Sequence, residues 1–457
     1  MARAKKEAAL TPEERLQAAL VPDWEWPYKL PENWCWTRHN SIMDIVGGAQ
    51  PEKAFFIREP KEGYVQLYQT RDYGENPVPV YIPQKYATKT TDEGDILLAR
   101  YGGSLGKVFR AHKGAYNVAL AKVIILYPEV VDDEFLYLYY YSHFYQDFCI
   151  KAGYGRSAQA GFNKSDLNEL LFPLPPFIEQ QRIVDRIESL FAKLDEAKEK
   201  AQAVVDSFET RKAAILHKAF TGELTAKWRE EHGVGMESWK THELAECFEI
   251  VSGIQKTPAR SPKDNPVPYL TVANVYRGRI DLSDIRYFEV TSKEIEKLKL
   301  QDKDILIVEG NGSGNEIGRC AIWHNELPLC IHQNHIIRMR RKTADILPEY
   351  ALHYLNSEAG KSIMRERSKT TAGLFNLSAG KIKTIPLPMA SLDEQSEIIH
   401  LIDSLLEKEQ WTKEAAEAVL DQIELMKKSI LARAFRGELG TNDPREESAV
   451  ELLKQII

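Results

Sequence analysis

The sequence contains little cysteine and no long apolar run. Its 457 residues include five cysteines without CxxC spacing, at Cys35, Cys149, Cys247, Cys320 and Cys330. Such a sparse, odd count is typical of the reducing cytosol and argues against a disulfide framework. No apolar stretch reaches the roughly 18 residues that a transmembrane helix needs, and the first residues lack the apolar core of a signal peptide. We therefore expect a cytoplasmic protein that makes no membrane contact.

Recognisable catalytic motifs are also lacking. There is no Asn/Asp-Pro-Pro-aromatic motif of the kind that amino-methyltransferases use. The run YGGSLGK at 101–107 superficially suggests a P-loop, but Tyr101 stands where Gly is required and Val108 where Ser or Thr must bind magnesium. Four possible zinc ligands fit no known zinc spacing: Cys320, Cys330, His332 and His335. We expect no catalytic centre, no metal and no cofactor in this chain.

The charge is acidic in total but uneven along the chain. There are 60 Lys and Arg against 67 Asp and Glu, a net charge of −7, which excludes a uniformly basic protein. Residues 238–385 carry 22 basic against 18 acidic side chains, whereas residues 394–439 carry 6 against 10. Because nucleic-acid binding depends on where charge lies, the acidic total does not exclude a DNA partner.

The most informative feature is an internal repeat. Residues 179–224 and 394–439 align without a gap, and both end in Ala-Phe-x-Gly-Glu-Leu. Each is preceded by Pro-Leu-Pro. Further upstream, Trp34 and the run 44–50 match Trp239 and the run 249–255. A globular domain followed by a long helix is therefore present twice.

Both long segments have the apolar spacing of a coiled-coil seam. The seam positions are Ile183, Ile187, Leu190, Leu194, Phe208 and Ile215 in the first, and Ile398, Ile402, Leu405, Ile423 and Ile430 in the second. Because neither helix has a sheet to cover its row of apolar seam residues, we expect the two helices to pack on each other in an antiparallel pair. The upstream regions mix strand-like runs with one compact helix each, over 134–145 and 348–360, which indicates an α+β fold.

These patterns divide the chain into seven segments. A capping box at Thr11 to Glu14 predicts a short helix over 12–20 in the N-terminal arm. The predicted segments are the arm 1–32, a first recognition domain 33–172, a first long helix 173–224, a linker 225–237, a second recognition domain 238–385, a second long helix 386–439 and a C-terminal tail 440–457.

Glycine-rich turns and polar clusters in the two domains contain the side-chain types that contact DNA. Lys and Arg neutralise phosphates, while Arg, Asn, Gln, Ser and Thr reach base edges. The candidates are Arg100, Tyr101, Ser104, Lys107, Arg156, Ser157 and Gln159 in the first domain, and Asn311, Ser313, Asn315, Arg319, Gln333, Asn334, Lys369, Thr370 and Thr371 in the second. Ordinary solvated loops would have the same composition.

The duplicated domain-plus-helix architecture resembles the specificity subunit of type I restriction–modification systems. The resemblance rests on the run Asn163 to Leu167 before Pro-Leu-Pro-Pro, the helix start EQQRIV at 179–184 and the Phe-Thr-Gly-Glu-Leu end. It implies a non-catalytic subunit in which each domain reads one half of a bipartite, asymmetric double-stranded DNA target. The helix pair then sets the spacer and docks two modification subunits, which methylate adenine. Restriction subunits join them, and S-adenosylmethionine, ATP and Mg²⁺ belong to these partners.

Two alternatives remain open at this point. The same scaffold would suit a methyltransferase that works without restriction subunits. A coiled-coil adaptor that binds only proteins would also have long helices, although it has no evident need for two divergent domains on two similar helices.

Overall fold

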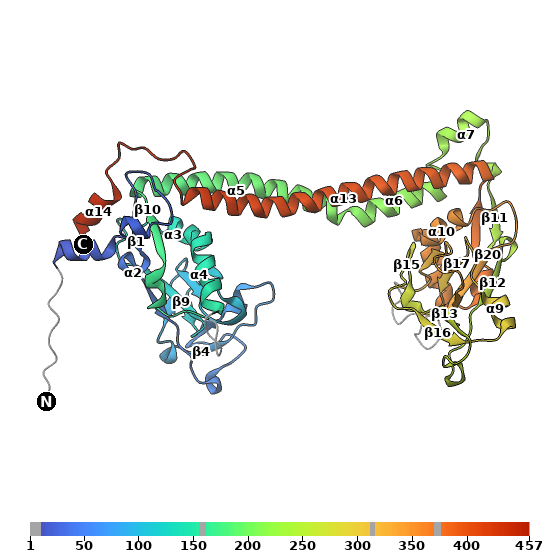
Figure 1. Ribbon diagram of the computed structural model, residues 1–457, viewed down its shortest axis with the longest axis horizontal. Helices are drawn as coiled ribbons and strands as arrows, with labels where there is room; N and C mark the ends of the chain where they lie inside the picture. The colour runs from blue at the N-terminus through green and yellow to red at the C-terminus, as the bar shows by residue number, and fades with distance from the viewer. Residues whose placement is uncertain (1–10, 155–160, 311–315, 370–375, 457) are drawn as a thin grey trace. The chain divides into compact units, whose positions relative to one another are not determined.

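The structure is a computed structural model that describes residues 11–154, 161–310, 316–369 and 376–456. The chain divides into two compact units. Unit 1 consists of Met1–Lys200 with Val419–Ile457, and unit 2 of Ala201–Ala418. Each contains one domain of strands and short helices attached to long helices (Figure 1). Unit 1 is therefore built from two separate stretches of chain, whereas unit 2 is continuous.

The described residues of the unit 1 domain form two four-stranded sheets and a two-stranded one. The first has the order β2-β9-β6-β7 and is antiparallel, with β2 Met43–Gly47, β9 Leu120–Ile125, β6 Ile96–Ala99 and β7 Val108–Arg110. The second has the order β4-β3-β8-β5, with β4 Tyr81–Pro83, β3 Tyr64–Tyr68, β8 Gly114–Tyr116 and β5 Thr90–Thr91. The third pairs β1 Cys35–Arg38 with β10 Leu171–Leu174.

The domain of unit 2 repeats this arrangement. Its antiparallel sheet has the order β12-β20-β17-β18, with β12 Phe248–Ser252, β20 Ile336–Arg341, β17 Ile305–Val308 and β18 Cys320–Ile322. The other strands are β16 Arg286–Glu289, β13 Pro266–Leu270 and β19 Ile331–His332 in one sheet, and the pair β11 Lys240–Glu243 with β21 Pro386–Met389. A hairpin of β14 Val275–Tyr276 and β15 Arg279–Ile280 has no counterpart among the described strands of unit 1.

Each domain has two consecutive helices where we predicted one. Unit 1 has α3 Asp133–Tyr139 and α4 His143–Tyr154, and unit 2 has α10 Pro348–Asn356 and α11 Glu358–Ser368. The prediction of single helices over 134–145 and 348–360 is wrong because a buried serine separates them, Ser142 and Ser357 respectively. Ser357 is extended and its side chain accepts from the Gly360 amide, which starts a new helix rather than continuing the old one.

Shorter helices complete the domains. They are α2 His39–Ile42 in unit 1, and α8 Leu244–Cys247, α9 Ser292–Leu298 and α12 Ala379–Lys383 in unit 2. The arm contains α1 Pro12–Ala19, which begins with the predicted capping box at Thr11 and Glu14.

The first long segment is nearly continuous. It forms α5 Phe177–Asp206 and α6 Phe208–Phe220, whereas the second forms one helix, α13 Leu392–Ala434. The interruption lies at Ser207, whose hydroxyl donates to the Ala203 carbonyl at 2.6 Å and accepts from Arg211. Such back-bonding competes with the helical ladder and bends helices locally.

The long helices are antiparallel within each unit, as the repeat predicts. In unit 1, Asp195 pairs with Lys427, and Lys198 pairs with Glu424 at 2.7 Å. Residue numbers therefore rise along α5 in the direction in which they fall along α13. In unit 2 the same opposed order relates α6 to α13. Arg211 pairs with Glu409, while Leu216, nearer the end of α6, shares a core with Ile398 and Ile402, nearer the start of α13.

The predicted seam residues divide into two groups. Those at the helix starts, Ile183, Ile187, Ile398 and Ile402, are fully buried in the domain cores. The expectation that only the partner helix covers these stripes is therefore wrong, because each domain covers the start of its own helix. Among the others, Ile423 is buried, while the half-buried ones are Leu190, Leu194, Phe208, Ile215, Leu405 and Ile430.

The repeated Ala-Phe-x-Gly-Glu-Leu motif anchors a helix end to a domain. The Phe435 ring lies 5.1 Å from that of Phe135 and 5.6 Å from that of Tyr139. In unit 2 the Phe220 ring lies 5.2 Å from the rings of Tyr350 and Tyr354, which are the matching residues. The pairs of Phe435 with Tyr139 and of Phe220 with both tyrosines are edge-to-face, an arrangement that adds stability beyond the buried area.

A buried glutamate begins each long helix. The Trp34 indole donates to Glu179 at 2.8 Å, and the Trp239 indole donates to Glu394 at 2.9 Å. The remaining contacts differ. Glu394 pairs with Arg229 at 2.6 Å, and Arg229 belongs to α7 Ala226–His232, a helix inside the segment predicted as a linker.

Glu179 is held instead by the tail that follows α13. Asn442 donates to it at 2.7 Å and Thr441 at 3.3 Å. Farther on, the tail forms α14 Ala449–Ile456, in which Ala449 and Leu453 are buried in the core of unit 1. The segment after one long helix thus covers the start of the other within each unit.

We predict that Arg229→Ala costs about 3–5 kcal/mol of unfolding free energy, because it leaves the carboxylate of Glu394 buried without a cation. The two side chains are only 8% and 1% exposed. Chemical denaturation of the purified chain measures the change. Glu196→Ala is the matched control, since it removes an ion pair whose side chains are 74% and 66% exposed, and such pairs contribute at most about 1 kcal/mol. Equal losses in the two variants would contradict the prediction.

Candidate nucleic-acid interface

Four chain segments meet at one end of the first sheet in unit 1. They are residues 47–50 at the end of β2, 100–101 after β6, 117–119 between β8 and β9, and 161–163, and we call them edge 1. Backbone hydrogen bonds join them. Ala49 N donates to Tyr116 O at 3.1 Å, Arg100 N to Ala119 O at 2.9 Å and Phe162 N to Arg100 O at 3.3 Å.

The matching segments of unit 2 meet in the same way. Edge 2 consists of residues 252–255 at the end of β12, 309–310 after β17, 333–335 between β19 and β20, and 376–377. Ile254 N donates to His332 O at 3.0 Å, Glu309 N to His335 O at 2.9 Å and Leu377 N to Glu309 O at 2.8 Å. The two edges therefore share one backbone framework.

A glycine makes the close approach of two segments possible in each edge. A Cβ added to Gly48 would lie 2.0 Å from the Asn117 carbonyl oxygen, and one added to Gly253 would lie 2.2 Å from that of His332. Two residues later the chain presents an exposed glutamine, Gln50 in edge 1 and Gln255 in edge 2. Both positions belong to the repeated Gly-x-Gln pattern of the sequence.

The residue beneath each edge is uncharged. The Tyr116 hydroxyl donates to Val46 O at 3.0 Å, and the Nδ1 of His332 lies 2.9 Å from Ile336 O. Burial raises the pKa of Tyr116 to about 12 and lowers the pKa of His332 to about 4, so both are neutral near pH 7. The charge of each edge therefore comes from the more exposed side chains around it.

The structure brings four predicted DNA-contacting residues to the edges. Arg100 and Tyr101 lie in edge 1, where the guanidinium is 4.9 Å from the tyrosine ring centre, and Gln333 and Asn334 lie in edge 2. Sequence analysis missed Glu309 and His335 as a pair, whose Oε2 and Nδ1 atoms are 3.4 Å apart. Glu309 aligns with Arg100 in the repeat, two residues after the matched runs 94–98 and 303–307, and this alignment could have identified it.

Other predicted residues lie outside the two edges. Ser104 and exposed Lys107 lie on the turn after β6, and exposed Lys369 follows α11. Arg319, which matches Lys107, is turned inward, donating to Val272 O at 2.6 Å and pairing with Glu316 at 3.2 Å. Eight predicted residues fall outside the described part of the chain: Arg156, Ser157, Gln159, Asn311, Ser313, Asn315, Thr370 and Thr371.

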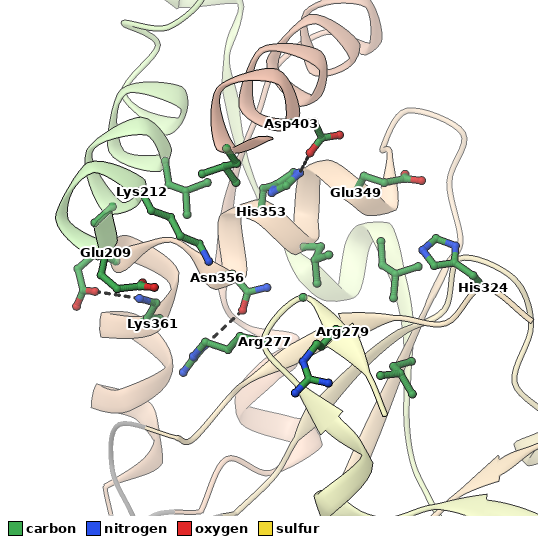
Figure 2. A pocket seen from close by; sticks show the side chains of 18 of the residues that line it. Glu209, Lys212, Arg277, Arg279, His324, Glu349, His353, Asn356, Lys361 and Asp403 are labelled. Atoms are coloured by element: carbon green, nitrogen blue, oxygen red, sulfur yellow. Dashed lines mark hydrogen bonds and ion pairs between the residues drawn. The ribbon is translucent and has the colours of Figure 1, made fainter. Parts of the chain in front are cut away.

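A groove lies between the domain and the long helices within unit 2 (Figure 2). It has a volume of about 720 Å³ and is lined by both acidic and basic side chains. His353 and Asp403 pair across it at 3.1 Å, and Arg277 donates to the Asn356 side chain at 3.3 Å. Unit 1 has a groove of about 1000 Å³ in the matching place, lined by Lys107 and Lys427 among others. Mixed charge of this kind suits a protein surface better than a nucleic-acid backbone.

Sequence analysis did not identify the hairpin that borders the groove of unit 2. Its tip places the guanidinium of Arg279 4.2 Å from the ring centre of Tyr276, and Gly278 has a positive φ of 74°. The sequence signal was the run Tyr-Arg-Gly-Arg at 276–279, with its basic residues flanking a turn glycine.

The described residues hold no cluster of three or more potential metal ligands. Within the same parts of the chain, no helix has the length and apolarity that crossing a membrane requires.

The chain belongs to the family of type I restriction modification DNA specificity domains, whose sequence profile matches residues 31–205 and 236–421. It is similar to the EcoKI specificity subunit of Escherichia coli strain K12, with 27% identity over 94% of this chain and 96% of that protein. It is also similar to the StySPI specificity subunit of Salmonella potsdam, with 24% identity over 90% of each. The resemblance found in the sequence is thereby confirmed.

Solved structures agree with the fold. One, from work on complex assembly and conformational transition of the type I R-M system, has a TM-score of 0.64 and 19% identity, covering 90% of this chain and all of that one. The HsdS subunit from Thermoanaerobacter tengcongensis has a TM-score of 0.59 and 19% identity, covering 91% and 99%. The α+β fold with two repeated domains is confirmed, and the chain is a DNA-specificity subunit rather than the modification or restriction enzyme.

We predict that Gly48→Ala and Gly253→Ala each weaken DNA binding and lower stability by about 1–3 kcal/mol, because the added methyl group must displace a backbone carbonyl. Gel-shift titration and chemical denaturation measure the two effects. Gly380→Ala is the control, since its added Cβ meets only the Ser378 hydroxyl at 3.9 Å. Wild-type DNA affinity in both edge variants would argue against a role of the edges in binding.

Proposed function

We propose that each domain reads one half of a bipartite, asymmetric DNA target and that the two edges make the base contacts. The observation that carries this proposal is that one backbone framework is built twice with different side chains. Tyr101 matches Gly310, and Val118 matches Asn334, while the hydrogen bonds that hold the segments are the same. A constant framework with variable side chains is what two readers of different sequences require.

We also propose that the long helices set the length of the spacer, the base pairs between the two half-sites that neither domain reads. The 43 residues of α13 span about 65 Å at about 1.5 Å per residue. One turn of DNA spans about 34–36 Å. A helix of that length is sufficient to separate two contact points by more than one turn.

The same helices are proposed to dock two modification subunits, which bind S-adenosylmethionine and methylate adenine. α13 carries large apolar side chains that the chain itself leaves uncovered. Trp411 is 78% exposed in unit 2, and Leu425 and Met426 are 64% and 49% exposed in unit 1. Exposed apolar side chains of this size are typical of protein interfaces. Restriction subunits, which use ATP and Mg²⁺, complete the proposed assembly.

A long-read map of adenine methylation tests the proposed DNA target. We expect cells that express this chain with its cognate modification subunit to gain a bipartite methylated motif with a fixed gap. Cells that express the modification subunit alone are the control. Unchanged methylation, with the two proteins shown to copurify, would contradict the proposal.

We predict that Trp411→Ala weakens association with the modification subunit by about 2 kcal/mol or more, the scale of an interface hot spot. Analytical ultracentrifugation or a pull-down titration of the purified pair measures the affinity. Trp24→Ala is the matched control, because Trp24 is 85% exposed but lies in the N-terminal arm. The docking assignment fails if the two tryptophan variants bind alike.

A further inference from the structure

The end of the central strand carries opposite charges in the two domains. Arg100 follows β6 and Glu309 follows β17, and each donates its amide to the matching carbonyl, that of Ala119 or His335, at 2.9 Å. The carbonyls of Arg100 and Glu309 in turn accept from the segment before the Pro-Leu-Pro run, from Phe162 N at 3.3 Å and Leu377 N at 2.8 Å respectively. The two residues therefore occupy one structural position.

The guanidinium of Arg100 lies at edge 1 without an ion-pair partner among the described residues. Its Nη2 donates to Val118 O at 3.0 Å, and its plane lies beside the Tyr101 ring. Its Nε is buried and has no partner in the described structure. This arrangement fixes the side chain, and no carboxylate of the described residues pairs with the guanidinium.

Glu309 is also held in place without a strong counter-ion. Its carboxylate lies 3.4 Å from the Nδ1 of His335, and the two side chains are 19% and 54% exposed. No Lys or Arg of the described residues pairs with it. A carboxylate beside a DNA backbone is repelled by phosphates, so it favours binding only if it accepts a hydrogen bond from a base.

We propose that this position selects a base in both domains, with Arg100 reading a guanine in one half-site and Glu309 reading the amino group of a cytosine in the other. The proposal rests on the function proposed above. Arginine donates two hydrogen bonds to O6 and N7 of guanine in the major groove, and glutamate accepts one from N4 of cytosine. The same backbone framework thereby gives opposite base preferences through one side chain.

The test is the methylation map of variants expressed with the modification subunit. Arg100→Lys keeps the positive charge but loses the two-pronged donor geometry, and Glu309→Gln keeps the shape but loses the charge. We expect each variant to relax one base of one half-site, guanine for Arg100→Lys and cytosine for Glu309→Gln. Discrimination at that base should fall about 5- to 150-fold, as for other base contacts, while the opposite half-site is unchanged.

Matched controls follow the antiparallel neighbours of these strands, at the opposite end of each sheet. Lys113 follows β7 in unit 1, and Glu326 follows β18 in unit 2, and both are exposed. Lys113→Met and Glu326→Gln should leave every position of the motif unchanged. Copurification with the modification subunit checks that each variant assembles. If Glu309→Gln does not copurify, Glu309→Asp, which shortens the side chain, is used in its place.

The possible failures are distinct. A wild-type map without a bipartite motif overturns the proposed function and this inference with it. A wild-type motif that stays unchanged in Arg100→Lys and Glu309→Gln overturns the inference alone. So does a pair of variants that both alter the same half-site.

Discussion

Each domain is joined to its long helix by a carboxylate that is buried at the helix start and hydrogen-bonded to a tryptophan indole. Glu179 and Glu394 are 0% and 1% exposed, so their desolvation must be offset by donors from several segments. In unit 2 the cation of Arg229 offsets the desolvation of Glu394. In unit 1 the offset consists of neutral donors from Trp34, Thr441 and Asn442, and burial raises the pKa of Glu179 in spite of them. These contacts attach the start of each long helix to its own unit.

Next to each glutamate, a glutamine connects the same helix start to the domain. Gln180 donates to Val130 O and accepts from Asp132 N, and Gln395 makes the matching bonds to Asp345 O and Leu347 N. These contacts join the N-termini of α3 and α10, whose N-cap residues are Asp132 and Leu347, to the long helices. These constant residues of the repeat therefore maintain geometry, and the proposed base contacts fall on residues that differ between the copies.

The repeat made most of the architecture predictable. It revealed two domains, two long helices and their antiparallel pairing, because matched motifs require matched environments. It did not reveal that Ser142 and Ser357 divide a helix, since both sit in runs of helix-compatible residues. The equivalence of Arg100 and Glu309 was also missed, because two aligned residues of opposite charge do not form a recognisable motif. The contacts of Arg229 and Asn442 come from segments that look like a linker and a tail, and only tertiary structure reveals their burial.

The split composition of unit 1 determines the order in which the protein can be completed on the ribosome. Unit 2 is one continuous stretch, so its core can close once Ala418 has left the exit tunnel. Unit 1 needs Phe435, Ala449 and Leu453 for its core, and these follow all of unit 2 in the chain. The domain that is synthesised first is therefore completed last. Its aromatic residues Phe135 and Tyr139 lack their contact with Phe435 until the whole of unit 2 has been synthesised.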